Sequence, residues 1–96
     1  MGEVVLFTIK TSKSAIEDFE KIKKSGLPSV KKKLARILEE LEKDPTKGIG
    51  SPEQLKGTEG IVYSRELTKK DRIVYEIYEE EKTIVISQFL GHYSDK

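Results

Sequence analysis

The chain has 96 residues, of which 18 are basic and 17 acidic, so its formal net charge is +1. This length suits one small domain, and we therefore expect a single domain over residues 1–96. The near balance of charge excludes a general attraction to nucleic acid, so any basic binding surface must come from segregation of charge on the fold. The lack of cysteine excludes disulfides and thiolate metal sites, and a single histidine argues against a transition-metal centre.

Membrane and secretion signals are not recognisable in the sequence. No apolar run approaches the roughly 18 residues that a membrane-spanning helix needs. The N-terminus also lacks the pattern of a secretory signal peptide. We therefore expect a cytoplasmic protein with no membrane partner. Although 36% of the residues are charged, Val- and Ile-rich runs recur along the chain, which favours a folded domain over a disordered one.

The N-terminal part of the chain predicts a strand followed by a helix. Residues Val4–Ile9 are mostly β-branched, aromatic or otherwise apolar, which favours a strand. Ser12 suits the N-cap of the helix that follows, and Gly26 suits its end. The apolar stripe of this helix consists of Ile16, Phe19 and Ile22.

A second helix is predicted from Ser29, which can serve as its N-cap, to about Lys43, where Asp44 and Pro45 end it. Its apolar positions have the spacing of an amphipathic helix and are Val30, Leu34, Ile37, Leu38 and Leu41. The first half of this helix carries a basic cluster formed by Lys31, Lys32, Lys33 and Arg36. This cluster is either a solvated helix face or a patch that contacts RNA phosphates, and the sequence leaves both interpretations open.

The second half of the chain predicts a long loop and three strands. Residues 46–60 hold four of the seven glycines, and a loop of this length in a small domain is typical of a functional segment. Strand-like runs follow at Ile61–Leu67, Arg72–Tyr78 and Thr83–Leu90, separated by short charged connections. The order β-α-α-β-β-β predicts an α+β fold with two helices packed on one face of a mainly antiparallel sheet.

Alternation within the run 72–78 assigns its side chains to two faces. Ile73, Tyr75 and Ile77 should face the helices, because successive strand residues point to opposite sides. Arg72 should therefore project from the open face of the sheet. Tyr63, in the preceding strand, is assigned with Tyr75 to the core or to the wall of a cleft.

Four short motifs of the second half, taken together, carry a family resemblance. In chain order they are Gly48–Lys56 (Gly-Ile-Gly-Ser-Pro-Glu-Gln-Leu-Lys), Tyr63-Ser64-Arg65, Asp71–Tyr75 and Gly91-His92-Tyr93. In this order and near this spacing, they resemble the YoeB/Txe toxins of bacterial toxin–antitoxin pairs, which belong to the wider RelE superfamily. The resemblance runs from about Asp44 to Tyr93, and the expected element order agrees with the compact RNase fold of that superfamily.

The resemblance implies a toxin that cleaves mRNA as an endoribonuclease, typically in the ribosomal A site, with no cofactor. Its implied partners are the ribosome, mRNA and a cognate antitoxin of the YefM/Phd-like kind, whose extended segment wraps the toxin. A homodimer is left open.

The resemblance also implies roles for individual residues. Glu53 matches the general base and His92 the general acid of the family. Arg72 matches the arginine that stabilises the transition state, and Tyr93 matches a neighbour that orients the substrate or phosphate. The chain continues for three residues beyond Tyr93, so a terminal carboxylate directly after this tyrosine is not available.

Two further residues match phosphate-binding positions of the family. Lys56 corresponds to a basic residue that contacts phosphate, and Arg65 to an arginine of a Ser-Arg-Arg stretch. The next arginine of that stretch is replaced here by Glu66, so this position is not expected to bind phosphate.

Metal-free cleavage of RNA needs only such a set of side chains. The 2′-OH is a built-in nucleophile, so a base must take its proton, an acid must protonate the 5′-oxygen, and cations must stabilise the phosphorane. Glu53, His92 and Arg72 with Lys56 would suffice, and the products would be a 2′,3′-cyclic phosphate and a 5′-hydroxyl. Two alternatives are a RelE-like protein that acts only by binding antitoxin or ribosome, and a ParE-like protein acting on gyrase. The complete acid–base set disfavours both.

Overall fold

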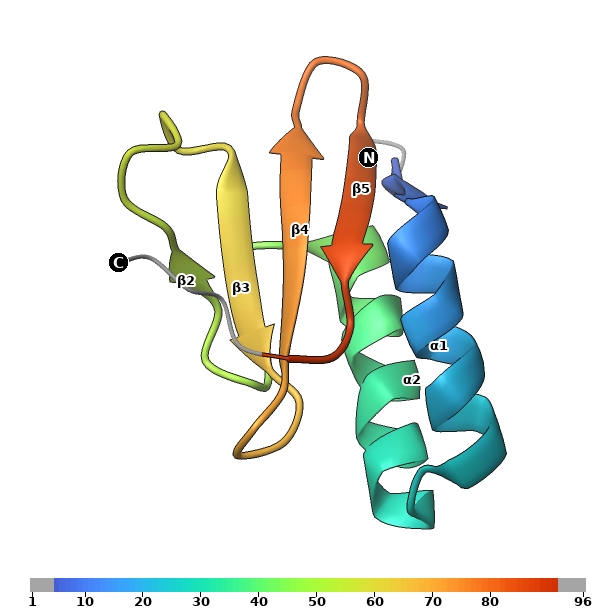
Figure 1. The fold of residues 1–96 in the computed structure, drawn as a ribbon. Helices are drawn as coiled ribbons and strands as arrows, with labels where there is room; N and C mark the ends of the chain where they lie inside the picture. The colour runs from blue at the N-terminus through green and yellow to red at the C-terminus, as the bar shows by residue number, and fades with distance from the viewer. Residues whose placement is uncertain (1–4, 92–96) are drawn as a thin grey trace.

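The computed structural model describes residues 5–91, which form two helices and five strands. In chain order the elements are β1 (Thr8–Thr11), α1 (Lys13–Ser25), α2 (Pro28–Lys43), β2 (Glu53–Gln54), β3 (Val62–Glu66), β4 (Arg72–Tyr78) and β5 (Thr83–Gln88). The strands form one sheet in the order β1-β5-β4-β3-β2, in which β1 runs parallel to β5 and the other neighbours are antiparallel. Figure 1 shows the two helices side by side near β5, whereas β2 forms the opposite edge. The expected α+β architecture is therefore confirmed.

Both helices begin and end where local chemistry permits. The Ser12 hydroxyl accepts a hydrogen bond from the Ala15 amide at 3.2 Å, so the predicted N-cap of α1 is confirmed. The predicted N-cap of α2 at Ser29 is wrong, because α2 already begins at Pro28 with Leu27 as its N-cap. Proline suits the first helical position, where its fixed φ is helical and its missing N–H would have no partner. The end of α2 at Lys43 agrees with the prediction.

The first strand lies further along the chain than predicted. It spans Thr8–Thr11 rather than Val4–Ile9, and Val4 itself lies outside the described residues. The reason is the register with β5, in which Thr8 pairs with Thr83, the first residue of that strand. Val5 and Leu6 therefore precede the start of β5 in this register and are 59% and 48% exposed.

The other strands need smaller corrections. β3 ends at Glu66 and β5 at Gln88, slightly inside the predicted runs, whereas β4 has the predicted bounds. A short strand, β2, also lies within the predicted loop and pairs with β3, with Glu53 opposite Ser64.

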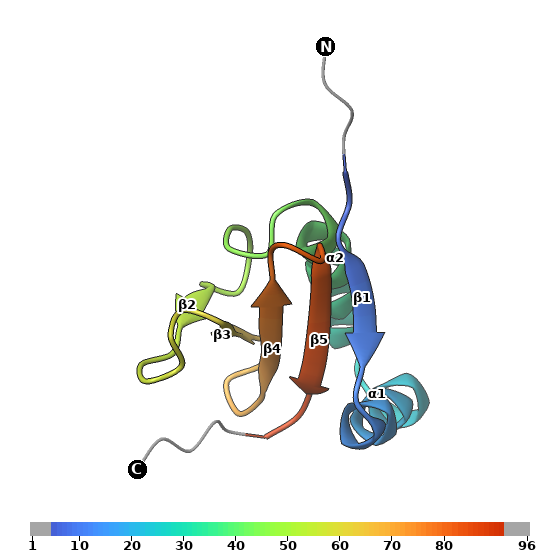
Figure 2. The ribbon, with the colours of Figure 1, turned by 90° about the horizontal axis from the view of Figure 1, so that it is seen from above.

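The core fills the space between the helices and the sheet. Ile73 and Tyr75 are fully buried and Ile77 nearly so, which confirms the predicted inward face of β4. The core cluster further contains Phe7, Ala15, Ile22, Leu34, Ile37, Leu41, Leu67, Ile84, Ile86 and Phe89. Seen from above, the helices again group near β1 and β5, and β2 lies at the far edge (Figure 2). The face of β3 and β4 that carries Arg72 thus lies away from the helix layer.

Truncation of Ile37 tests this packing. Ile37 on α2 is fully buried, so Ile37→Ala should lower the free energy of unfolding by about 2–5 kcal/mol, measured by urea denaturation. Leu27→Ala is the control, because Leu27 is 67% exposed and its loss should cost less than about 0.5 kcal/mol. Equal losses from the two variants would contradict the described core.

Candidate active site

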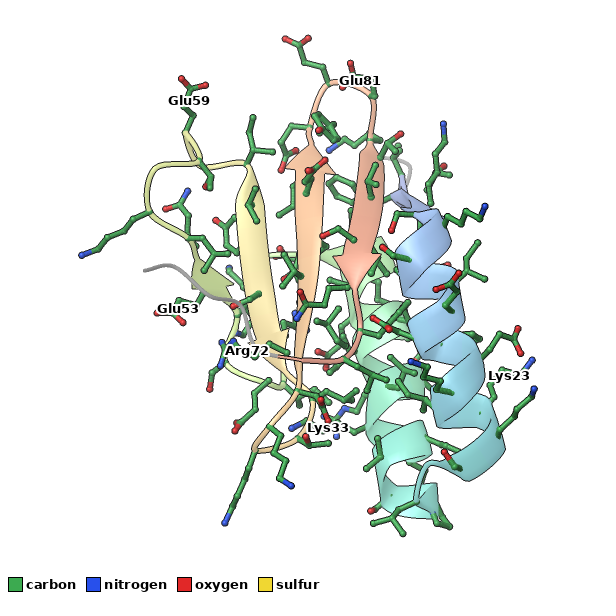
Figure 3. The ribbon with its side chains drawn as sticks, in the orientation of Figure 1. Lys23, Lys33, Glu53, Glu59, Arg72 and Glu81 are labelled. Atoms are coloured by element: carbon green, nitrogen blue, oxygen red, sulfur yellow. The ribbon has the colours of Figure 1, made fainter. Side chains whose placement is uncertain are left out.

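Glu53 and Arg72 meet on the open face of the sheet. Arg72 is the first residue of β4, and Glu53 lies on the edge strand β2. The Arg72 Nη2 donates to Glu53 Oε1 at 3.4 Å, and the two side chains are 30% and 69% exposed. Figure 3 shows both side chains near the β2 edge, far from the exposed end of α1 at Lys23. Residues 19 positions apart in the sequence thus form an accessible pair of opposite charge.

Ser64 joins the two members of this pair. The Nε of Arg72 donates to Ser64 Oγ at 3.1 Å, and Ser64 lies directly opposite Glu53 in the β2–β3 register. The Ser64 side chain is fully buried, so its hydroxyl is a well-defined acceptor that restrains the Arg72 guanidinium. Sequence reasoning gave Ser64 no separate role. Strand alternation could have revealed this contact. In the β3–β4 pair, Ser64 and Arg72 lie on the same face of the sheet.

A sharply turning segment delivers Glu53 to this place. Gly48, Gly50 and Ser51 adopt positive φ values of 130°, 85° and 51° between α2 and β2. A Cβ on Gly48 would overlap a carboxylate oxygen of Glu40, so a larger residue cannot occupy this position without displacement. The carbonyl of Gly50 then accepts from the Glu66 amide at 2.7 Å, which attaches the segment to β3 three residues before Glu53.

The segment after β5 is fixed beside the backbone of Arg72. The Arg72 amide donates to the Gly91 carbonyl at 2.9 Å, and the Gly91 amide donates to Asp71 Oδ1 at 2.8 Å. Gln88 Nε2 donates to the carbonyls of Gly91 at 2.9 Å and of Arg72 at 3.3 Å. His92 and Tyr93 lie outside the described residues, but the residue that precedes them is therefore attached to the start of β4.

Asp18 fixes the same segment from the helix layer. Its Oδ2 accepts from the Phe89 amide at 3.2 Å and from the Leu90 amide at 3.3 Å. Phe89 is buried and packs on Phe19, with a distance of 5.5 Å between the ring centroids. Sequence reasoning missed Asp18, since no periodic pattern marks a carboxylate that caps backbone amides 71 residues later.

The two residues expected to bind phosphate occupy different environments. Lys56 is exposed in the loop directly after β2. Arg65 lies on the helix-facing side of β3, and its side chain is fully buried. This burial does not agree with the expected phosphate contact of Arg65, because its guanidinium faces protein acceptors in the interior.

Five hydrogen bonds occupy the Arg65 guanidinium. Nη1 donates to Glu40 Oε1 at 2.8 Å, and Nε donates to the Tyr75 hydroxyl at 3.1 Å. The remaining donors reach the backbone carbonyls of Ile49 at 3.3 Å, Asp44 at 3.3 Å and Lys47 at 2.7 Å. A guanidinium has five N–H donors, so every donor of this buried charge has an acceptor.

The buried arginine changes the acid–base properties of its neighbours. Desolvation would raise the pKa of the Glu40 carboxyl, but hydrogen bonds from the Ile49 amide and Arg65, with the charge of Arg65, hold this pKa below its usual value. Burial raises the pKa of the Tyr75 hydroxyl, although Arg65 acts in the opposite direction. Glu40 is therefore an anion at neutral pH and pairs with the arginine.

The basic cluster of α2 borders the same loop from outside. Lys32, Lys33 and Arg36 line a shallow groove of about 390 Å³ together with Ile49. Arg36 also forms a 3.5 Å ion pair with Glu40. This geometry agrees with either a solvated face or a phosphate contact.

Two further properties concern residues 5–91. Within this range, no three His, Cys, Asp or Glu side chains gather closely enough to hold a metal ion. Neither helix of this part of the chain has the length and apolar character needed to cross a membrane.

Comparison with known proteins connects this geometry to a family. Residues 11–93 match the model of the YoeB-like toxin of the bacterial type II toxin-antitoxin system. The chain is 34% identical to the toxin YoeB of Streptomyces coelicolor over 64 residues. This aligned region covers 67% of this chain and 74% of that protein. The YoeB dimer from Staphylococcus aureus superimposes with a TM-score of 0.77 at 28% identity, over 91% of this chain and 98% of that one. The heterotetrameric YoeB–YefM complex of the same organism gives a TM-score of 0.75 at the same identity and coverage.

Neutralising Glu40 tests its pairing with Arg65. Glu40→Gln should lower the free energy of unfolding at pH 7 by about 1.5–3 kcal/mol. Because the folded-state pKa of Glu40 is lowered, its contribution is fully present above the unfolded value of 4.5 and is lost as the pH falls through the folded value. The difference between wild type and variant should therefore narrow below about pH 4.5 in urea titrations. Glu39→Gln on the exposed side of α2 is the control, and a difference that stays constant with pH would contradict the pairing.

Proposed function

Because the chain belongs to the YoeB-like toxin family of bacterial type II toxin–antitoxin systems, we propose that it is a ribosome-dependent endoribonuclease that cleaves mRNA. The observation that carries the proposal is the Glu53–Arg72 pair, exposed on the open face with Ser64 beneath it. A carboxylate next to a guanidinium can combine proton abstraction with stabilisation of a phosphorane. The cleavage then needs no bound cofactor.

In the proposed reaction, Glu53 removes the proton of the 2′-OH, and the oxygen attacks the adjacent phosphorus. Arg72 stabilises the negative charge that develops on the phosphorane. His92 protonates the departing 5′-oxygen, so the products are a 2′,3′-cyclic phosphate and a 5′-hydroxyl. Tyr93 orients the phosphate, and Lys56 contributes positive charge from the loop after β2.

The resting ion pair is suited to opening. Its 3.4 Å contact lies at the surface, with Glu53 69% exposed, and exposed pairs of this kind contribute only about 0–1 kcal/mol. An RNA phosphate can therefore replace the carboxylate at Arg72 Nη2 at low cost. This replacement leaves Glu53 available to accept the proton of a nearby hydroxyl, while Ser64 keeps the guanidinium in place.

The attachment of Gly91 supports the role given to His92. Consecutive Cα atoms are about 3.8 Å apart, so His92 follows within one residue of the hydrogen bond between Gly91 and the Arg72 backbone. Asp71 and Gln88 restrict this segment further. The chain thus leads to His92 from a residue that is hydrogen-bonded to the start of β4.

Partner proteins follow from the relatives. Staphylococcus aureus YoeB is described as a dimer and as a complex with YefM. We extend both associations to this chain, with a YefM-like antitoxin as the inhibitory partner and a homodimer as the free form. The Lys31–Arg36 cluster would contribute phosphate contacts on the ribosome.

Replacement of the three reacting residues tests the proposal. Glu53→Gln, Arg72→Ala and His92→Gln should each lower the rate of mRNA cleavage on programmed ribosomes by about 10²–10⁴-fold, since each removes proton transfer or charge stabilisation. Primer extension after brief mixing gives the rates. Glu81→Gln is the control, because this exposed residue lies in the β4–β5 turn, well away from Glu53 (Figure 3). Wild-type protein that produces no new 5′ ends at occupied codons would exclude the nuclease.

Glu66 should weaken substrate binding, because this acidic residue pairs with Arg72 in the β3–β4 register and so belongs to the same face of the sheet. A unit charge near the phosphate contributes on the order of 1 kcal/mol in a partly exposed site, so Glu66→Gln should lower KM about two- to fivefold with little change in kcat. The difference should shrink as salt rises, because screening weakens the repulsion. If Glu66→Gln left KM unchanged at low salt, the predicted repulsion between Glu66 and the substrate phosphate would be contradicted.

A further inference from the structure

The side chain of Arg65 is fully buried, yet the proposed mechanism gives it no chemical step. A charge in the interior is tolerated only where its pairing and hydrogen bonds are complete. Three of the five acceptors around Arg65 are backbone carbonyls of one segment, at Asp44, Lys47 and Ile49. The guanidinium therefore binds the connection between α2 and β2 along most of its length.

Glu40 contacts the same connection together with Arg65. One oxygen of this carboxylate accepts from both Arg65 Nη1 at 2.8 Å and the Ile49 amide at 2.9 Å. Gly48 passes so close that a Cβ there would lie 2.8 Å from Arg65 Nη1. The backbone at Gly48 and Ile49 thus packs directly against the Arg65–Glu40 pair.

Glu53 depends on this anchoring, because its own strand is short. β2 has two residues, and its register with β3 consists of two pairs, Glu53 with Ser64 and Gln54 with Tyr63. Pairing this short is weak by itself. The contacts that precede it, from Arg65 to the segment 44–49 and from the Glu66 amide to Gly50, restrict where β2 can lie.

We propose that Arg65 is a positioning residue that sets the place of Glu53 relative to Arg72 through the 44–50 segment, an inference that rests on the proposed nuclease function. The two arginines stand on opposite faces of the β3–β4 pair. Arg72 acts on the phosphate, and Arg65 fixes the backbone that carries the base. Displacement of a catalytic group by about 1 Å can cost about 100-fold in rate.

Arg65→Lys is the first test variant, since lysine keeps the positive charge but cannot bridge five acceptors in a plane. It should lower kcat/KM for mRNA cleavage about 10–100-fold when Glu53 is present. In a Glu53→Gln background the same change should have less than about a threefold effect, because the displaced group no longer takes the proton. Rates are compared at a temperature where urea titrations show every variant to be folded.

Gly48→Ala serves as a second variant if Arg65→Lys does not fold. It disturbs the same segment, whose Gly48 φ is 130°, and it retains the Arg65 side chain itself. Its rate loss should depend on Glu53 in the same way. Tyr75→Phe is a partial version of the same change, because it removes one Arg65 contact and the hydrogen bond to the Pro45 carbonyl but leaves the three loop carbonyls bound to Arg65. It should therefore have a smaller effect than Arg65→Lys.

A measurement without substrate separates this inference from the nuclease proposal. The Leu55 amide, which donates to the Val62 carbonyl at 2.9 Å beside β2, should exchange with deuterium at least about tenfold faster in Arg65→Lys, while amides of β4 keep their rates. Equal rate losses in the wild-type and Glu53→Gln backgrounds, or unchanged exchange at Leu55, would overturn the positioning role. Glu53→Gln that cleaves as fast as wild type would instead overturn the proposed function of Glu53, and the exchange result would still decide the anchoring.

Discussion

The Arg65 guanidinium carries a full positive charge into the interior, and the arrangement of the surrounding elements follows from the need to pair it. Its acceptors come from α2 through Glu40, from β4 through Tyr75 and from the connection between α2 and β2. The Tyr75 hydroxyl extends the hydrogen-bond network, because it donates to the Pro45 carbonyl at 2.6 Å. Helix layer, sheet and loop are therefore joined at one polar point within an otherwise apolar core.

Strand β3 connects this interior network to the surface site. Arg65 points to the helix side, and the preceding residue, Ser64, points to the open face and binds Arg72. Because neighbouring residues of a strand project to opposite faces, one dipeptide contacts both the interior network and the Arg72 side chain on the open face. The edge strand β2, which carries Glu53, also pairs with β3.

The sequence predicted the parts of the fold that follow from periodicity. The apolar stripe of α2, the cap at Ser12 and the inward face of β4 were all readable, and the last of these placed Arg72 on the open face. Arg65 could not be placed in this way, because arginine is usually exposed and its acceptors here are mostly backbone carbonyls, which no residue pattern reveals. β2 escaped prediction because two residues are too few for a period. Glu53 was identified as a candidate from the family motifs. Its contact with Arg72 could not be predicted from the sequence, because it depends on the tertiary structure.

The parallel pairing of β1 with β5 joins residues 8–11 to residues 83–86, which are far apart in the described chain. β5 lies between β1 and β4, so β1 has no neighbour in the sheet until β5 is in place. Such long-range pairing forms late, because the loop-closure entropy must be overcome first. During synthesis, a chain still lacking β5 has neither a closed sheet nor the backbone segment at Gly91 that borders Arg72. The geometry of the site is thus completed only after residues 83–91 have left the ribosome.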